Sequence, residues 1–258
     1  INTNPDLYAR FLVLQADNIS LSAGNIALAL SQMVEPTKIG TTDFWHKQGR
    51  YVMDEEMGKG AAVFVPPRNQ NFRGYLMGSY YDVSQTTGKP MREPEPLAEG
   101  SERMNAAFAA LLGAAPVGFI ENTGLDVPVR YNERECILEI NTEYSAGQVF
   151  AALATEISFA RLHDRGMNRD YDRGAFQLNA ESVGFMVCRR FGVDCPLPDA
   201  AGVQQFYSYY SPDDRGKSLD FMRQTARNMG DTVERGIQPR QQEHTASRGS
   251  NNRQYGRR

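Results

Sequence analysis

The sequence contains few of the residues that most often bind metals or form disulfides. Its 258 residues include only three histidines and three cysteines, the cysteines lying at positions 136, 188 and 195 without a CxxC pair. An odd number of cysteines at this spacing argues against a disulfide framework and against a cysteine-based zinc site. We therefore expect the reducing environment of the cytoplasm.

Other absences exclude further classes of protein. The chain has no run of about 18 apolar residues, so we expect no membrane-spanning helix. It has no charged-then-apolar leader and no phosphate-binding glycine motif. Its formal net charge of −3 argues against attraction of the whole protein to nucleic acid or to a membrane. Because the chain opens at Ile1, we expect a processed product or a piece of a longer parent chain, whose other domains are candidate partners.

The residues that are present favour an α+β fold. Apolar residues make up 41% of the chain and aromatic residues 10%, which is enough for a hydrophobic core. We expect helices around a small, mostly antiparallel sheet, with additional N-terminal helices and a β-hairpin. The predicted helices span residues 5–16, 22–33, 42–48, 101–112, 145–163, 176–191 and 211–236, and the predicted strands span residues 61–66, 72–83, 116–121, 127–132 and 135–141.

One Pro- and Glu-rich stretch, residues 91–100, is the best candidate for a linker. It separates an N-terminal helical and β-hairpin region at 1–90 from an α+β region at 101–237. The remaining residues, 238–258, are rich in Gln, Arg, Ser and Asn and contain almost no apolar side chain. We expect a disordered, Arg-rich tail there.

Two consecutive amphipathic segments organise the C-terminal half. In residues 145–163 and 176–191, apolar side chains recur at steps of three and four, which is typical of helices. Ser145 is a suitable N-cap for the first helix and Gly192 a suitable stop for the second. If the two helices pack together, Glu156 and Glu181 lie on neighbouring elements.

This helix pair resembles the core of zincin-like proteins of mobile elements, the ArdC-type antirestriction and ImmA/IrrE-type metallopeptidase families, as found in gut Firmicutes. In these families the first helix carries HExxH and the second supplies an acidic ligand. The matching positions here read Thr155, Glu156, Ile157, Ser158 and Phe159, followed by Glu181 in the second helix. The stretch at 80–90, YYDVSQTTGKP, resembles a strand end that such proteins carry before the metallopeptidase-like part.

The departures from HExxH predict a pseudoenzyme. Zinc in such sites is held by two histidines one helical turn apart, but Thr155 is a poor zinc ligand and Phe159 cannot bind metal. Glu156 is then a vestigial general base, and we expect no bound metal. The resemblance implies a non-catalytic domain that acts by binding an unknown protein or single-stranded DNA. In active relatives the last strand of the sheet, which we expect here at 135–141, lies at the edge of the substrate cleft, and substrate peptide adds to that edge.

Two alternatives stay open. The first is an active metallopeptidase with altered ligands, in which Glu156, Glu181 and His163 hold zinc. The second is an antirestriction-type module that binds single-stranded nucleic acid through aromatic stacking and phosphate neutralisation. The residues for that second role are Tyr75, Tyr80, Tyr81, Arg253, Arg257 and Arg258.

Overall fold

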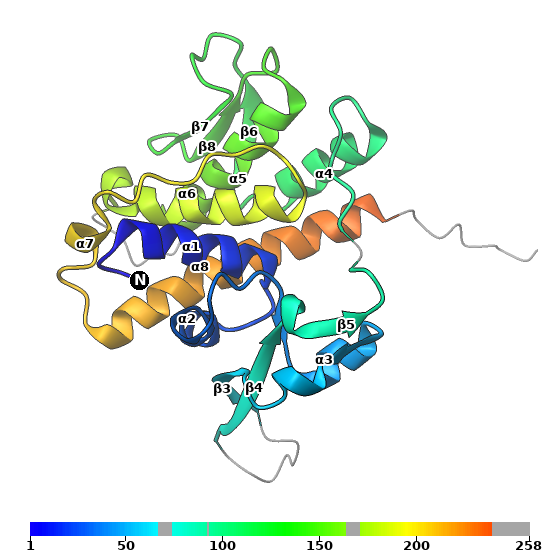
Figure 1. The fold of residues 1–258 in the computed structure, drawn as a ribbon. Coiled ribbons are helices and arrows are strands. Elements are labelled where there is room, and N and C mark those ends of the chain that lie inside the picture. Colours follow the sequence, from blue (N-terminus) through cyan, green and yellow to red (C-terminus); the bar gives the residue numbers. More distant parts are fainter. Residues whose placement is uncertain (67–73, 92, 164–170, 239–258) are drawn as a thin grey trace, which may run out of the picture.

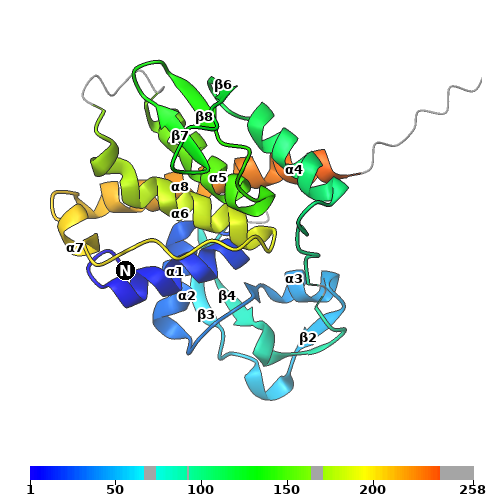
Figure 2. The same cartoon turned by 90° about the horizontal axis from the view of Figure 1, so that it is seen from above.

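The protein, described here from a computed structural model, has an α+β fold, as the sequence predicts. The structure describes residues 1–66, 74–91, 93–163 and 171–238. Figures 1 and 2 show a central group of helices with a small sheet on one side and a β-hairpin on the other. No helix among the described residues is long and apolar enough to cross a membrane.

The helices begin and end close to the predicted positions, because capping residues mark several of their ends. Ser22, Ser101 and Ser211 each accept a hydrogen bond from a backbone N–H in the first turn of the helix that follows. The helices are α1 (Pro5–Asp17), α2 (Ala23–Gln32), α3 (Thr42–Lys47), α4 (Glu102–Gly113), α5 (Ala146–His163), α6 (Arg173–Arg190), α7 (Val203–Phe206) and α8 (Pro212–Ile237), with short 3₁₀ turns η1 (Asp54–Glu56) and η2 (Val83–Gln85).

Most strands pair antiparallel, as expected, but one pair does not. The strands are β1 (Ile39–Gly40), β2 (Arg50–Val52), β3 (Ala61–Val65), β4 (Leu76–Asp82), β5 (Thr86–Gly88), β6 (Gly118–Glu121), β7 (Val129–Asn132) and β8 (Ile137–Ile140). In the C-terminal sheet β8 lies between β6 and β7, and it pairs antiparallel with β7 but parallel with β6. Because β8 lies between the other two strands, β7 is an edge strand, and the expectation that the last strand of the sheet forms the edge is wrong.

The N-terminal hairpin forms in the predicted region and is completed by a helix. Strands β3 and β4 pair antiparallel from Ala61 opposite Tyr80 to Val65 opposite Leu76. On the other side of β3, Asn25 of α2 bonds to both the N–H and the C=O of Phe64, at 3.0 and 2.7 Å. The Asn25 amide thus takes the place of a neighbouring strand and satisfies the hydrogen-bonding groups of Phe64 at the edge of β3.

The motif at 80–90 has a structural role in the turn after β4. The Asp82 carboxylate accepts the N–H of Ser84 at 3.0 Å and of Thr37 at 2.7 Å, while the Gln85 side chain accepts the N–H of Asp82 at 2.9 Å. Gly88 has φ +133°, and a Cβ there would lie 2.5 Å from the carbonyl oxygen of Gly49. The motif fixes how the hairpin leads into β5.

The N-terminal helices and the C-terminal half share a hydrophobic core. Tyr8 of α1 and Ser182 of α6 are both fully buried, and their hydroxyls are hydrogen-bonded at 2.9 Å. The core continues from these residues to Val233 in α8. The expected division of the chain at residues 91–100 stays a prediction, and the tail at 239–258 lies outside the described residues.

Candidate functional site

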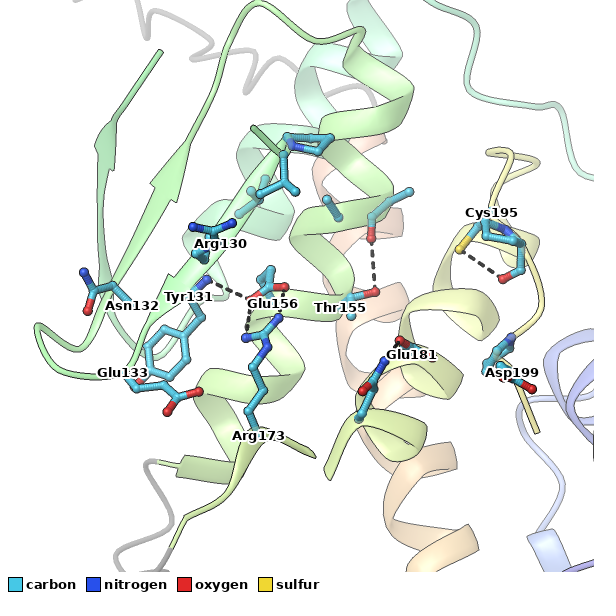
Figure 3. A pocket seen from close by; sticks show the side chains of 18 of the residues that line it. Arg130, Tyr131, Asn132, Glu133, Thr155, Glu156, Arg173, Glu181, Cys195 and Asp199 are labelled. Carbon is cyan, nitrogen blue, oxygen red and sulfur yellow. Dashed lines mark hydrogen bonds and ion pairs between the residues drawn. The ribbon is translucent and has the colours of Figure 1, made fainter. Parts of the chain in front are cut away.

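A cleft of about 1000 Å³ opens beside the helix pair. Its walls are β7 with the residues on either side of it, the facing surfaces of α5 and α6, and the segment 195–199 that follows α6. The floor is formed by small side chains of α5, Ala151 and Ala152, together with Thr155. Figure 3 shows charged and polar side chains from each of these elements around the cleft.

Glu156, the expected vestigial base, is buried in this cleft, and both of its carboxylate oxygens accept hydrogen bonds. Its Oε2 accepts the backbone N–H of Tyr131 in β7 at 2.8 Å. Its two carboxylate oxygens also accept hydrogen bonds from Arg173, at 3.0 Å from Nη1 and 2.5 Å from Nη2 (Figure 3). Only 9% of the Glu156 side chain is exposed, so a paired cation is what makes its burial as a carboxylate tolerable.

Arg173 also covers the position where the resemblance places a second histidine. It is the first residue of α6, whose N-cap Asp172 accepts the N–H of Gly174. Its guanidinium carbon lies 3.8 Å from the centroid of the Phe159 ring. The same cation therefore neutralises Glu156 and stacks on Phe159, in the manner of a cation–π contact.

The position of the first histidine, Thr155, lies where the two helices approach each other. Thr155 faces Gly184 of α6, where a Cβ would lie 2.1 Å from the Thr155 Oγ1. The Thr155 hydroxyl donates to the carbonyl oxygen of Ala151 at 3.4 Å. This contact lets α5 and α6 approach closely at Thr155.

The other two candidate ligands have partners of their own. Glu181 lines the cleft and accepts a hydrogen bond from Gln177 at 2.8 Å. His163, at the end of α5, has its Nδ1 2.7 Å from the Tyr131 hydroxyl, and its ring stacks near Tyr171 with centroids 4.6 Å apart. The structure therefore brings Glu156 and Glu181 to one cleft and directs His163 into an aromatic cluster.

A metal of the kind that the resemblance implies does not fit this donor set. Divalent transition metals need several imidazole, thiolate or carboxylate donors converging on one point. Within the described ranges, no group of three His, Cys, Asp or Glu side chains could hold a metal ion. The best-placed carboxylate is bound to a guanidinium, and the two histidine positions hold Thr155 and Phe159.

The edge of β7 brings backbone hydrogen-bonding groups to the cleft in addition to its charged side chains. Because the N–H of Tyr131 points away from β8, Val129 two residues earlier presents its backbone groups on the same side. No strand of the described chain pairs with β7 there. The cleft thus combines a strand edge with apolar walls from Val127 and Leu197.

The residues expected to contact nucleic acid do not lie together. Tyr80 and Tyr81 are buried, and their hydroxyls bond to Asn25 and to the backbone of Gly58. Tyr75 is 73% exposed and packs edge-on against the exposed Phe64 with ring centroids 6.4 Å apart. Arg253, Arg257 and Arg258 lie outside the described residues.

Sequence reasoning missed Arg173, Gly184 and the backbone of Tyr131. The sequence carried a signal only for Gly184, a glycine inside a helical pattern, which often marks a close helix contact. Arg173 lies seventeen residues from Glu156, and nothing in its local pattern distinguishes it from the nearby arginines.

Comparison with known proteins supports the fold. No protein-family model and no curated protein sequence matches the chain. Among solved structures, the Mn(II)-bound antirestriction protein ArdC from the R388 plasmid matches with a TM-score of 0.52 and 20% identity, over 85% of this chain and 84% of that one. The metal-free structure of that protein matches with a TM-score of 0.49 and 18% identity over 83% of each chain. At this identity the likeness concerns the fold, and the ArdC-like α+β fold expected from the helix pair is confirmed.

Proposed function

We propose that this chain is an antirestriction-type protein of a mobile element, and that its metallopeptidase-like cleft binds an extended polypeptide segment without hydrolysing it. The observation that carries this proposal is the ion pair of Arg173 with Glu156. A general base must accept a proton from a water molecule beside the scissile bond. Here both carboxylate oxygens already accept hydrogen bonds from a guanidinium and a backbone amide.

The β7 edge supports a polypeptide as the ligand. An extended peptide adds to an open strand edge through main-chain hydrogen bonds, and neighbouring pockets hold its side chains. Val129 belongs to the edge strand β7 and lines the cleft beside the apolar residues Val127 and Leu197. The antirestriction part of the proposal is supported by the fold shared with the R388 protein. In that case the bound polypeptide segment would belong to a protein of the restriction machinery.

The experiment is protection of unmodified phage or plasmid DNA in a restricting host that expresses the full chain. Glu156→Gln keeps the size of the side chain and removes its basicity, so a binding function predicts undiminished protection. Val129→Pro removes one backbone N–H at the edge, where proline is tolerated, and should abolish protection. Val129→Ala is the matched control, because it loses similar side-chain packing and keeps the N–H.

Metal content of the purified, untagged protein separates this proposal from an altered metallopeptidase. A binding protein predicts protection without a stoichiometric metal and without sensitivity to chelators. Loss of protection in Glu156→Gln, together with a stoichiometric metal that Glu181→Ala or His163→Ala removes, would overturn the proposal in favour of catalysis.

Binding of single-stranded nucleic acid is a second candidate function, favoured by the exposed end of the hairpin. Phe64, Tyr75 and Met77 are 51%, 73% and 64% exposed and lie near one another on β3 and at the start of β4. Bases stack readily on such rings. Salt-dependent binding to single-stranded DNA that weakens in Tyr75→Ala and after removal of residues 238–258 would support this function. Absent or salt-independent binding would exclude it.

A further inference from the structure

The end of α6 folds the chain back so that two cysteines become neighbours. Gly192 adopts φ +63°, its N–H donates to the carbonyl oxygen of Arg189 at 3.3 Å, and the N–H of Val193 donates to that of Cys188 at 3.0 Å. These bonds form the Schellman motif that commonly ends helices. Beyond it the chain runs back along α6 toward α7 (Figure 1).

Cys188 lies on the cleft-facing side of α6. Gln177, Glu181, Gly184 and Cys188 follow at steps of four, three and four, so they share one helical face. The first two line the cleft and Gly184 packs on Thr155. Cys188 is fully buried at the end of this row.

Cys195 lies on the returning segment and lines the cleft (Figure 3). The residue is partly exposed, its thiol donates a hydrogen bond to the carbonyl oxygen of Pro196 at 3.7 Å, and it lies close enough to the thiol of Cys188 for the two to interact. We propose that Cys188 and Cys195 are a reversible redox pair that forms a disulfide on the wall of the cleft. The pair joins an accessible thiol to a buried partner within reach, which is the arrangement of an attacking and a resolving cysteine.

The electrostatics of the two thiols agree with this division of roles. The hydrogen bond from Cys188 lowers the pKa of Cys195, although burial opposes the shift. The same hydrogen bond, together with burial, raises the pKa of Cys188. Of the two thiols, Cys195 is therefore the one that loses its proton more readily, and Cys188 is the one that keeps its proton to a higher pH.

A low-molecular-weight disulfide such as oxidised glutathione is a sufficient oxidant. The Cys195 thiolate attacks one sulfur, forms a mixed disulfide and releases one glutathione thiolate. That thiolate or a water molecule takes the proton of Cys188, whose sulfur then attacks Cys195 and releases the second glutathione. The two protein thiols lose two electrons, and the oxidant is reduced to two thiols. The product ties segment 195–199 to α6.

The test uses the full chain with Cys136→Ser, which removes the exposed third thiol. The protein is incubated in glutathione redox buffers, quenched by alkylation and analysed by intact mass and peptide mapping. We expect a loss of about 2 Da and a peptide linking positions 188 and 195. Addition of Cys188→Ala should instead leave one glutathione on Cys195, since the resolving thiol is gone.

A stable glutathione adduct on Cys195 in the chain that keeps Cys188, or no modification under excess oxidised glutathione, would overturn the redox pair. Circular dichroism of the Cys188→Ala chain checks that the fold is kept. The formation of the disulfide is read by mass and does not depend on ligand binding. Its effect on binding in the cleft rests on the proposed function, and comparing protection by the wild-type chain and Cys195→Ser tests that effect separately.

Discussion

Arg173 and Glu156 form a two-point ion pair in the cleft beside the helix pair, with Nη2–Oε1 and Nη1–Oε2 distances of 2.5 and 3.0 Å. The guanidinium supplies the positive charge that a buried carboxylate requires. It also rests on the Phe159 ring, so one side chain contacts both the retained glutamate and one of the two departures from HExxH. Arg173, Glu156 and Phe159 therefore form one cluster of contacts in the cleft.

Removing the cation should leave a buried, unpaired carboxylate. We expect Arg173→Ala to lower the free energy of unfolding by about 2 kcal/mol, less than for a fully buried pair because 39% of the Arg173 side chain is exposed. Urea unfolding measures this change. Arg134→Ala, an exposed arginine at the same cleft, is the control and should change stability by less than about 0.5 kcal/mol. Equal effects of the two substitutions would contradict a special role for the pair.

The contact of Thr155 with Gly184 should make that glycine intolerant of a side chain. Gly184→Ala places a Cβ 2.1 Å from Thr155 Oγ1, and overpacking of this kind costs about 1–3 kcal/mol. Gly216→Ala is the matched control, because Gly216 lies within α8 and a Cβ added there would meet no atom within 4 Å. There alanine should stabilise the helix by about 0.5–1 kcal/mol. Chemical denaturation of both variants measures the difference, and stabilisation by both would show that the helices can separate at no cost.

Two side-chain amides bond to the edge of β3, and the buried one, Asn25, should contribute more to stability than the exposed one, Gln32. Asn25→Ala removes the partners of both backbone groups of Phe64 and should destabilise the protein by about 1–3 kcal/mol. Gln32 makes the equivalent pair of bonds to Ala62 at 2.9 and 3.0 Å but is exposed. Gln32→Ala should therefore cost less, because water replaces its bonds. Thermal unfolding compares the two variants, and a larger loss in Gln32→Ala would contradict this reasoning.

Two buried phenols should make the protein sensitive to alkaline pH. Burial raises the pKa of Tyr207 to about 12 and also raises the pKa of Tyr8. In the unfolded chain a phenol loses its proton near pH 10, so between about pH 10 and 12 the unfolded state binds fewer protons than the folded state. Stability should fall with rising pH in this window, by about 1 kcal/mol per pH unit for Tyr207 around pH 11.

Urea unfolding between pH 8.5 and 11 measures this loss. Tyr207→Phe should make the pH dependence shallower, whereas Tyr209→Phe, which alters a side chain that is 95% exposed, should leave it unchanged. An unaltered slope in Tyr207→Phe would show that other groups govern alkaline unfolding.

Local sequence patterns determined the helices and most of the strands. The three- and four-residue spacing of apolar side chains located α5 and α6, and Ser145 and Gly192 marked an end of each. Gln148 donates its N–H to the Ser145 hydroxyl at 3.3 Å, and Gly192 forms the turn after α6. The loss of both histidines from the HExxH positions was also readable directly, because it depends only on residue identity.

The tertiary structure decided which side chains meet. The partners of Glu156, the packing of Thr155 on Gly184 and the thiol contact of Cys188 with Cys195 join residues whose local patterns give no indication of one another. The parallel pairing of β6 with β8 also depends on the path of the chain through β7. Hydrophobic periodicity reports which face of an element is buried. It does not report the partner across the interface, and the chemistry of this cleft depends on those partners.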